Sequence, residues 1–349
     1  MANLFSRVRI KNINLKNRIL MPPLAVRNPG KSGFVNDIVV DYYSKMSGLG
    51  MGLVITENVF VSPESKVMPN QLLLSHDKFI EGHKKLVNAI HKNEAKVAVE
   101  INHAGANLFD IPELKTMLAN KEEGDFVVDD EGDVRKPLNS INEKDLSKKD
   151  IINIVESFGD AAKRAIDADY DMVEIHAAHG FLINQFLSPF INKRSDEYGG
   201  SLANRMRILI EIIEDVRHKI GETPIIVRFA VSDNPPQFTF YPNGLKPEDG
   251  LKVAKEISSV KGVDMIDISG GYSGSRPKEL KEIEGYYVPY SSAFKEIINI
   301  PVNVTGGIRT PEFANYVIKS GKADTVGIGR ALLADKEWIS KAAEKILEE

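Results

Sequence analysis

Short apolar runs alternate with longer amphipathic segments along the whole chain, in eight rounds. The apolar runs are rich in Val and Ile and end at Gly, Pro or polar residues, a pattern that is typical of buried parallel strands. The predicted strands are Ile19–Ala25, Leu53–Asn58, Lys96–Ile101, Met172–His176, Ile225–Ala230, Met265–Ser269, Val302–Thr305 and Thr325–Ile328.

The segments between these runs carry apolar residues at helical spacing. After Leu202, for example, Ile208, Ile212 and Val216 recur every four residues, and Ser201 stands where its hydroxyl can cap the first turn. The clearest predicted helices are Asp37–Leu49, Phe79–Lys92, Lys148–Asp167, Leu202–Ile220, Pro247–Ser259 and Pro311–Ser320.

Strands that alternate with helices over this length favour a single-domain (β/α)8 TIM barrel covering residues 1–349. An open doubly wound sheet stays an alternative, because strand order is not visible in a sequence. Two polar insertions interrupt the alternation, after the third strand at His103–Glu143 and after the fifth at Val231–Leu245. The first is expected to form a small hairpin that turns near Asp130–Gly132.

Composition narrows the cellular setting and the partners. The formal net charge is -4, which gives no electrostatic reason to expect nucleic acid or an acidic membrane surface as a partner. The chain has no Cys, so disulfides, Cys-ligated metal clusters and thiol catalysis are excluded. The amino-terminal segment lacks the apolar core of a secretory signal, and no apolar run is long enough to span a membrane. A cytoplasmic protein acting on a small molecule is expected, and self-association stays open.

The segment DMVEIHAAHGFLINQFLSP, residues 171–189, carries the strongest chemical signal. His176 ends a predicted strand and His179 lies in the following turn, so both imidazoles can reach the active-site end of a barrel. Two N–H donors that converge on a carbonyl oxygen would polarise it and stabilise an enolate. Packed or surface histidines are the alternative, and a metal site lacks an evident third ligand.

These residues and those around them resemble the old yellow enzyme family of flavin oxidoreductases. HAAHGFLINQFLSP with NKRSDEYGGSLANRMR resembles the signature stretch of that family. Further similar blocks follow the family's order, namely LKNRILMPPLA (15–25), ITENVFVSP (55–63), VEINHAG (99–105), IIVRFAVSD (225–233), VTGGIRTPE (304–312) and GIGRALL (327–333). The similarity runs from about Leu4 to about Trp338, nearly the whole chain.

The resemblance implies FMN at the carboxyl ends of the strands, with NADH or NADPH as the reductant. The FMN phosphate would lie at Gly306–Gly307 and Gly329–Arg330, where backbone N–H groups and a guanidinium are available. The alternatives are an ordinary tight turn for the glycines and a surface ion pair for Arg330. Arg228 would lie beside N1 and O2 of the flavin, or else form a structural ion pair with a strand carboxylate. By the same resemblance, the flavin would be lined by Pro22, Pro23, Leu24, Ala25 and Asn58.

The sequence departs from the family pattern at several of these positions. Ala25 stands where many members have Cys or Thr, and Glu100 stands where Gln is usual, beside the flavin pyrimidine. We expect Glu100 either to have a pKa raised by burial or to lower the flavin potential. Phe181 replaces the tyrosine that usually donates a proton, so Tyr272 or water would take that role. Arg27 stands where some members place a substrate-facing Tyr and would favour an acidic or phosphorylated substrate, with a surface residue as the alternative.

The function implied is reduction of the C=C bond of α,β-unsaturated carbonyl compounds, with hydride taken from NADH or NADPH through FMN and with His176 and His179 holding the carbonyl oxygen. FMN-dependent dehydrogenation of an amine or another small substrate is the main alternative. A barrel aldolase or isomerase acting on a phosphorylated sugar, and a flavin binder without activity, stay open as further alternatives.

Overall fold

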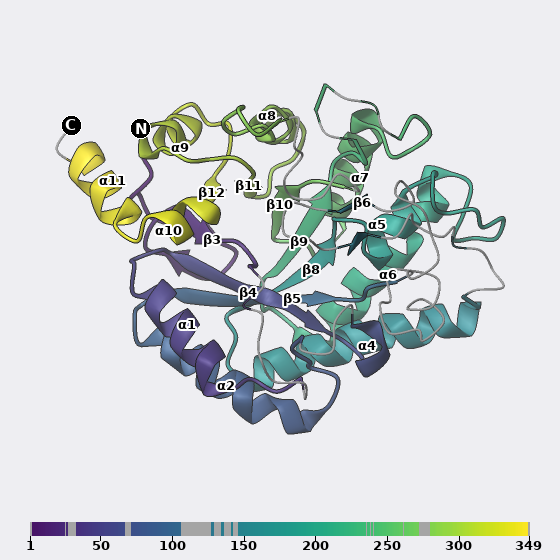
Figure 1. The fold of residues 1–349 in the computed structure, drawn as a ribbon. Helices are drawn as coiled ribbons and strands as arrows, with labels where there is room; N and C mark the ends of the chain where they lie inside the picture. The colour runs from purple at the N-terminus through teal and green to yellow at the C-terminus, as the bar shows by residue number, and fades with distance from the viewer. Residues whose placement is uncertain are drawn as a thin grey trace.

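The computed structural model describes residues 2–24, 26, 33–66, 71–105, 127–128, 134–135, 141, 146–234, 236–237, 239, 241–260, 262–271 and 280–347. Eight parallel strands close into a barrel in the order β10-β11-β12-β3-β4-β5-β8-β9, which confirms the (β/α)8 prediction and excludes the open sheet (Figure 1). The barrel strands are β3 (Ile19–Met21), β4 (Leu53–Phe60), β5 (Lys96–Asn102), β8 (Met172–Ala177), β9 (Ile225–Ala230), β10 (Met265–Ser269), β11 (Val302–Thr305) and β12 (Thr325–Gly327).

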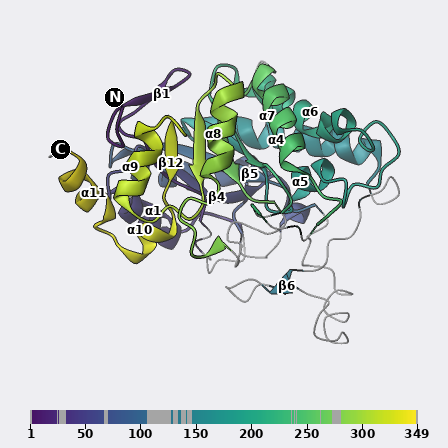
Figure 2. The same ribbon diagram turned by 90° about the horizontal axis from the view of Figure 1, so that it is seen from above.

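Helices surround these strands, as the turned view also shows (Figure 2). They are α1 (Asp37–Ser47), α2 (Ile80–His91), α4 (Lys148–Asp167), α5 (Leu182–Leu187), α6 (Leu202–Ile220), α7 (Pro247–Ser259), α8 (Val288–Ile297), α9 (Pro311–Lys319), α10 (Arg330–Ala334) and α11 (Trp338–Leu347). Two short 3-10 turns, Pro63–Ser65 and Asp77–Phe79, complete the described helical segments. None of the helices among these residues is both long and apolar enough to cross a membrane.

Local chemistry explains where several helices begin. Ser201 accepts a hydrogen bond from the backbone of Asn204 at 3.2 Å and caps α6, as predicted. Ser147 caps α4 in the same way, and Asp150 returns the bond to Ser147 in a capping box. Thr310 caps α9 ahead of Pro311, which needs no N–H partner at the first helical position.

The hairpin predicted in the first insertion is present. Strand β6 (Val127–Val128) pairs antiparallel with β7 (Val134–Arg135), while the predicted turn at Asp130–Gly132 lies outside the described residues. In the second insertion, the carboxylate of Asp233 accepts bonds from Leu245 N at 2.6 Å and from Ser188 Oγ at 2.6 Å. Asp233 therefore ties both ends of that insertion to the segment that follows α5.

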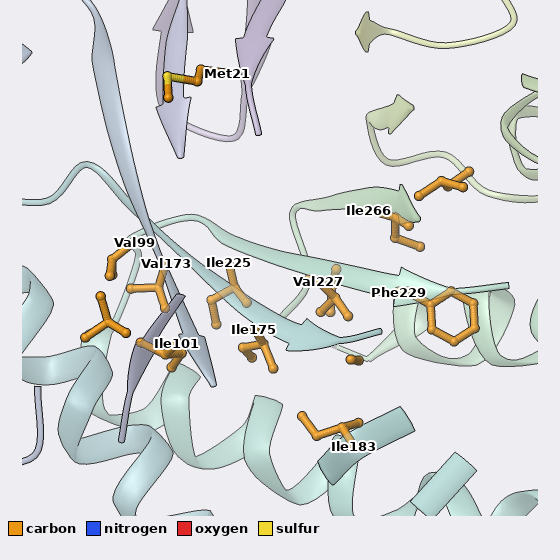
Figure 3. Close-up of a cluster of buried hydrophobic side chains, with 14 of the residues drawn as sticks. Met21, Val99, Ile101, Val173, Ile175, Ile183, Ile225, Val227, Phe229 and Ile266 are labelled. Atoms are coloured by element: carbon orange, nitrogen blue, oxygen red, sulfur yellow. The ribbon is translucent and has the colours of Figure 1, made fainter. Parts of the chain in front are cut away.

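Two apolar layers hold the barrel together. The larger layer lies between the strands and the helices, and Figure 3 shows part of it, with Ile175 of β8 and Ile183 of α5 between the sheet and the helices. The smaller layer fills the amino-terminal end of the barrel interior with Leu20, Leu53, Ile55, Ala98, Met172, Ile226 and Met265. A hairpin of β1 (Val8–Ile10) and β2 (Ile13–Leu15) covers this layer, because Ile10 and Leu15 pack within it and are fully buried.

Three aspartates join the strands at the same end. Asp171, Asp264 and Asp324 each precede a barrel strand, and each accepts a bond from the first or second backbone N–H of the preceding strand. Each aspartate also pairs with a cation, namely Lys96, Arg217 and Lys295 respectively. The amino-terminal end is thus built for stability, and the opposite end remains for chemistry.

Candidate active site

On each of four neighbouring strands, the side chains that point into the barrel change from apolar to polar within two residues. Side chains two residues apart point to the same side of a strand, so each polar group follows an apolar one on the inner face. The pairs are Ala98 and Glu100 on β5, Met172 and Glu174 on β8, Ile226 and Arg228 on β9, and Met265 and Asp267 on β10. A belt of buried charged groups therefore lies directly above the apolar layer.

Glu100 lies at the centre of this belt and is fully buried. Its Oε1 accepts a bond from Asn58 Nδ2 at 2.9 Å, and its Oε2 lies 3.3 Å from Arg228 Nη1 and 2.7 Å from His176 Nδ1. Burial by itself would raise the pKa of Glu100, but the charges of His176 and Arg228 outweigh burial and lower this pKa to about 2. The expectation of a raised pKa at Glu100 is therefore wrong, because it took account of burial and not of these partners.

The pKa of the neighbouring carboxyl of the belt, Glu174, is shifted in the opposite direction. Glu100 and Glu174 face each other across the β5–β8 pair, and both are fully buried. Burial, with the charges of Asp267 and Glu100 added to it, raises the pKa of Glu174 well above its usual value. Burial also raises the pKa of Asp267, to about 6, although Arg228 lowers it in part. The belt thus keeps an acid group in its neutral form beside a carboxylate.

Arg228 joins the carboxylates on either side of it. Its Nε lies 3.4 Å from Asp267 Oδ2, in addition to the contact with Glu100, and the side chain is 4% exposed. Asp267 in turn accepts bonds from Asn303 Nδ2 and from Thr305 Oγ1 at the end of β11. The structural ion pair expected as the alternative role of Arg228 is present, and it leaves the remaining guanidinium nitrogen, Nη2, for another acceptor.

His176 and His179 lie together at the end of β8. Their ring centroids are 5.0 Å apart, and the ring of Phe181 lies 5.0 Å from that of His176. His179 adopts φ 55°, and its Nε2 lies 2.6 Å from Ser269 Oγ of β10. Nε2 of the fully buried His176 has no hydrogen-bond partner among the described residues, and its Nδ1 makes the close contact with Glu100 without an aligned hydrogen bond. A buried polar nitrogen in that state indicates a missing ligand.

The predicted phosphate residues gather on the other side of the barrel. Gly307 has φ 69°, and a Cβ there would lie 2.5 Å from the ring of Tyr286, while a Cβ at Gly306 would lie 2.5 Å from Tyr287. Both glycines are thus required by the tyrosines behind them, as well as being suited to a phosphate. The exposed Arg330 reaches Tyr286 Oη at 3.4 Å, so the guanidinium is held beside the same turn.

The end of β3 lies next to this turn. A Cβ at Gly329 would be 3.2 Å from Pro22 and 3.5 Å from Leu24, which places these residues together. Pro23, between them, is half-buried. Ala25, Arg27 and Tyr272 were also predicted to line the site, and these positions lie outside the described residues.

FMN fits the residues that are present. Its phosphate would find backbone N–H groups at Gly306–Gly307 and the exposed guanidinium of Arg330, and its polar ring edge would find Asn58, Glu100 and Arg228. The unpartnered Nε2 of His176 is left to donate a hydrogen bond to a bound ligand or to accept one from it. Sequence reasoning missed Glu174 and Asp267, although both are charged residues inside apolar strands. Glu174 lies two residues before the predicted site residue His176, and Asp267 lies on a predicted barrel strand.

Comparisons with known proteins agree with this geometry. Residues 3–349 match the model of the NADH:flavin oxidoreductase / NADH oxidase family. An NADH oxidase of Thermoanaerobacter brockii is 38% identical over 98% of this chain, which spans only 51% of that protein. An NADPH dehydrogenase of Clostridium acetobutylicum is 33% identical, with 97% of this chain and 94% of that protein covered.

Among solved structures, an old yellow enzyme homologue of Zymomonas mobilis shares the fold, with a TM-score of 0.77 and 24% identity over 99% of this chain and 93% of that one. The family binds FMN and uses NADH or NADPH, so the predicted cofactors are confirmed at this level. By its sequence match along nearly the whole length and by its barrel, the chain belongs to the NADH:flavin oxidoreductase / NADH oxidase family.

Proposed function

We propose that the chain is an FMN-dependent oxidoreductase that takes hydride from NADH or NADPH and reduces the C=C bond of α,β-unsaturated carbonyl compounds. The observation that carries this proposal is the pair of imidazoles at the end of β8, with ring centroids 5.0 Å apart and with one buried nitrogen unpartnered among the described residues. Two such groups suit a carbonyl oxygen that gains negative charge during the reaction. Family membership supports flavin chemistry over the aldolase and isomerase alternatives.

Each group of residues has a distinct part in this proposal. Bound FMN would accept hydride from the nicotinamide and deliver it to the substrate. Gly306, Gly307 and Arg330 would bind its phosphate, and Arg228 would favour negative charge on the reduced ring. His176 and His179 would hold and polarise the substrate oxygen, while Phe181 would pack against the substrate. Substrate and nicotinamide would use the same place in turn.

The test is an anaerobic two-step titration of the purified, FMN-loaded protein. We expect NADH or NADPH to bleach the flavin absorbance and 2-cyclohexenone to restore it. His176→Ala should slow the second step by about 100-fold or more and leave bleaching nearly unchanged, because the imidazole is assigned to the carbonyl. Seeing no reoxidation by any enone, together with rapid reoxidation by dioxygen, would contradict the proposed substrate class. Bleaching by a small amine instead of nicotinamide would favour the dehydrogenase alternative.

A further inference from the structure

The Glu100–His176 contact decides which nitrogen of His176 carries a proton. Nδ1 of His176 lies 2.7 Å from Glu100 Oε2, and both side chains are fully buried. The ring N–H direction is not well aligned with this oxygen, but the two atoms are in close contact. A lone pair on Nδ1 would be repelled by a carboxylate at this distance, whatever the angle. Nδ1 must therefore carry hydrogen.

A carboxylate at position 100 fixes the direction of the hydrogen bond with Nδ1 of His176, which an amide would leave open. A Gln side chain can accept a hydrogen bond from Nδ1–H, or it can donate one to a bare Nδ1. An ionised Glu can only accept. Glu100 is ionised, since Asn58 Nδ2 donates to one of its oxygens and the guanidinium of Arg228 lies 3.3 Å from the other. With Glu100 present, neutral His176 thus has its lone pair on Nε2.

Nε2 is the atom of His176 that can meet a substrate. No described residue gives it a hydrogen-bond partner, whereas Nε2 of the neighbouring His179 lies 2.6 Å from Ser269 Oγ. Neutral His176 could accept a hydrogen bond at Nε2 but could not donate one to a carbonyl oxygen. Donation requires the imidazolium, in which both nitrogens carry hydrogen.

We propose that Glu100 is a positioning residue that makes carbonyl binding by His176 depend on the imidazolium form, so that His176 donates a proton as well as a hydrogen bond. This inference rests on the proposed function, because it concerns the same carbonyl oxygen. The charged or titratable groups that the described structure places around His176 are Glu100 on β5, Glu174 on its own strand, Arg228 on β9, Asp267 on β10 and His179 in the next turn. Burial and the neighbouring carboxyl groups raise the pKa of Glu174 and favour its neutral form, so Glu100 is the carboxylate that pairs with the imidazolium.

The proton balance is simple. As the β-carbon gains the hydride that the nicotinamide supplied in the earlier half-reaction, the carbonyl oxygen becomes an enolate oxygen. The Nε2–H bond of His176 breaks, an O–H bond forms, and neutral His176 keeps its Nδ1–H against Glu100. The enol then becomes the saturated carbonyl compound by taking a proton at the α-carbon and releasing one from oxygen. Solvent restores the imidazolium. This route explains how the site can work with Phe181, which has no hydroxyl, packed 5.0 Å from His176.

The first measurement is histidine-selective ¹⁵N NMR on the FMN-loaded protein, with His176→Gln used to assign the signal. The two ring nitrogens of a neutral tautomer have distinct shifts, so the protonated one can be identified. At high pH, the wild-type signal should show hydrogen on Nδ1. Glu174→Gln, a matched neutral replacement on the strand of His176 itself, should retain it. Glu100→Gln should shift it toward hydrogen on Nε2. A wild-type signal with hydrogen on Nε2 would overturn the inference without any variant.

The second measurement is the pH profile of kcat/KM for 2-cyclohexenone, over about pH 5 to 9. The wild-type value should fall as pH rises, because only an imidazole with hydrogen on both nitrogens donates at Nε2. Glu100→Gln should give a flatter profile, because its neutral imidazole can still donate from Nε2. Equal profiles in the two proteins would refute the gating role. Expected NMR tautomers without enone reduction would instead refute the proposed function and leave the tautomer assignment intact.

Discussion

At the scale of single residues, buried carboxyl groups near the strand ends differ in how they are paired. Glu100 has two cationic neighbours, whereas Glu57 on β4 is 3% exposed and accepts only a 3.4 Å bond, from the backbone of Val26. Its other oxygen has no partner among the described residues. Burial raises the pKa of Glu57 to about 7, so this carboxyl is stored in its neutral form at lower pH.

We expect Glu57→Gln to remove a pH dependence of stability. The pKa of Glu57 is higher in the folded chain than in the unfolded chain, so its contribution to stability is complete below about pH 4.5 and is lost as pH rises through about 7. The difference between the two pKa values corresponds to roughly 3 kcal/mol. Urea unfolding should show that the free energy of unfolding falls less between pH 5 and pH 9 in the variant than in the wild type. If the free energy of unfolding of the variant fell as much as that of the wild type, neutral Glu57 would not be the source of the pH dependence.

Arg330→Gln should weaken FMN binding because it removes the exposed guanidinium beside the Gly306–Gly307 turn. A charge-assisted bond to phosphate corresponds to a weakening of about 10- to 100-fold in Kd. The measurement is the quenching of FMN fluorescence on titration with apoprotein. Lys341→Gln on α11, an exposed cation paired with Asp335, is the control and should not change Kd. Unchanged affinity in Arg330→Gln would remove this residue from the phosphate site.

The sequence offered more on the residues of the candidate site than on their partners. Arg228 could be selected as a charged group inside an apolar strand, His176 from its place at the end of a strand, and Glu100 from the family resemblance. Their pairing could not be predicted, since it depends on register across strands, such as Glu100 opposite Glu174 and Arg228 opposite Asp267. The error in the pKa of Glu100 has the same origin, because burial is visible in a sequence pattern and a neighbouring charge on another strand is not.

At the scale of elements, the amino-terminal aspartates tie neighbouring strands together. Asp264 accepts from Ile225 N at 2.9 Å and pairs with Arg217 at 2.6 Å, with Lys11 close by at 3.6 Å. One carboxylate thus joins two strands, the end of α6 and the β1–β2 hairpin. Its side chain is only 15% exposed, so water cannot fully replace it.

Asp264→Ala should lower the free energy of unfolding by about 2–4 kcal/mol, because a backbone N–H and a guanidinium lose their acceptor. Chemical denaturation would measure this, and the flavin spectrum of the folded variant should be unchanged because the site lies at the other end of the strands. Glu312→Ala removes an exposed pair with Lys345 and should cost less than about 1 kcal/mol. Similar costs for the two variants would show that the buried connection adds nothing.

Predicted elements agree closely with the structure where the apolar period is strong. The eight strands and the long helices, such as α4 and α6, begin and end within a few residues of the prediction. The described helices that were not predicted are α5 (Leu182–Leu187), α8, α10 and α11, and the β1–β2 hairpin was not predicted either. All residues of α5 are buried, so that short segment has no polar face from which a helical period could be seen.

At the scale of the whole molecule, function and stability are separated along the barrel axis. The carboxyl ends of the strands carry the charged belt and the imidazoles, whereas the amino ends are filled with hydrocarbon and covered by the β1–β2 hairpin. This division is expected for a (β/α)8 barrel. It predicts that mutations at the covered end change folding without changing the flavin environment.

Ile10→Ala tests this separation directly. Ile10 is fully buried in the layer beneath the belt, so its truncation should cost about 2–5 kcal/mol of stability. Thermal unfolding would report the loss, and the flavin absorbance below the transition should match that of the wild type. Asn14→Ala, on the exposed side of the same hairpin, should stay within about 0.5 kcal/mol. An altered flavin spectrum in Ile10→Ala would mean that the two ends are coupled.

The hydrocarbon layer at the closed end has a consequence for hydrogen isotopes. Glu174 lies directly above Met172, and apolar side chains fill the barrel interior beneath it on its own strand and on both neighbouring strands, at Met172, Ala98 and Ile226. We therefore expect the acidic hydrogen on Glu174 to exchange mainly through the charged belt, past Glu100 and His176. In heavy water, a ligand bound over the imidazoles should therefore slow the exchange of this hydrogen for deuterium.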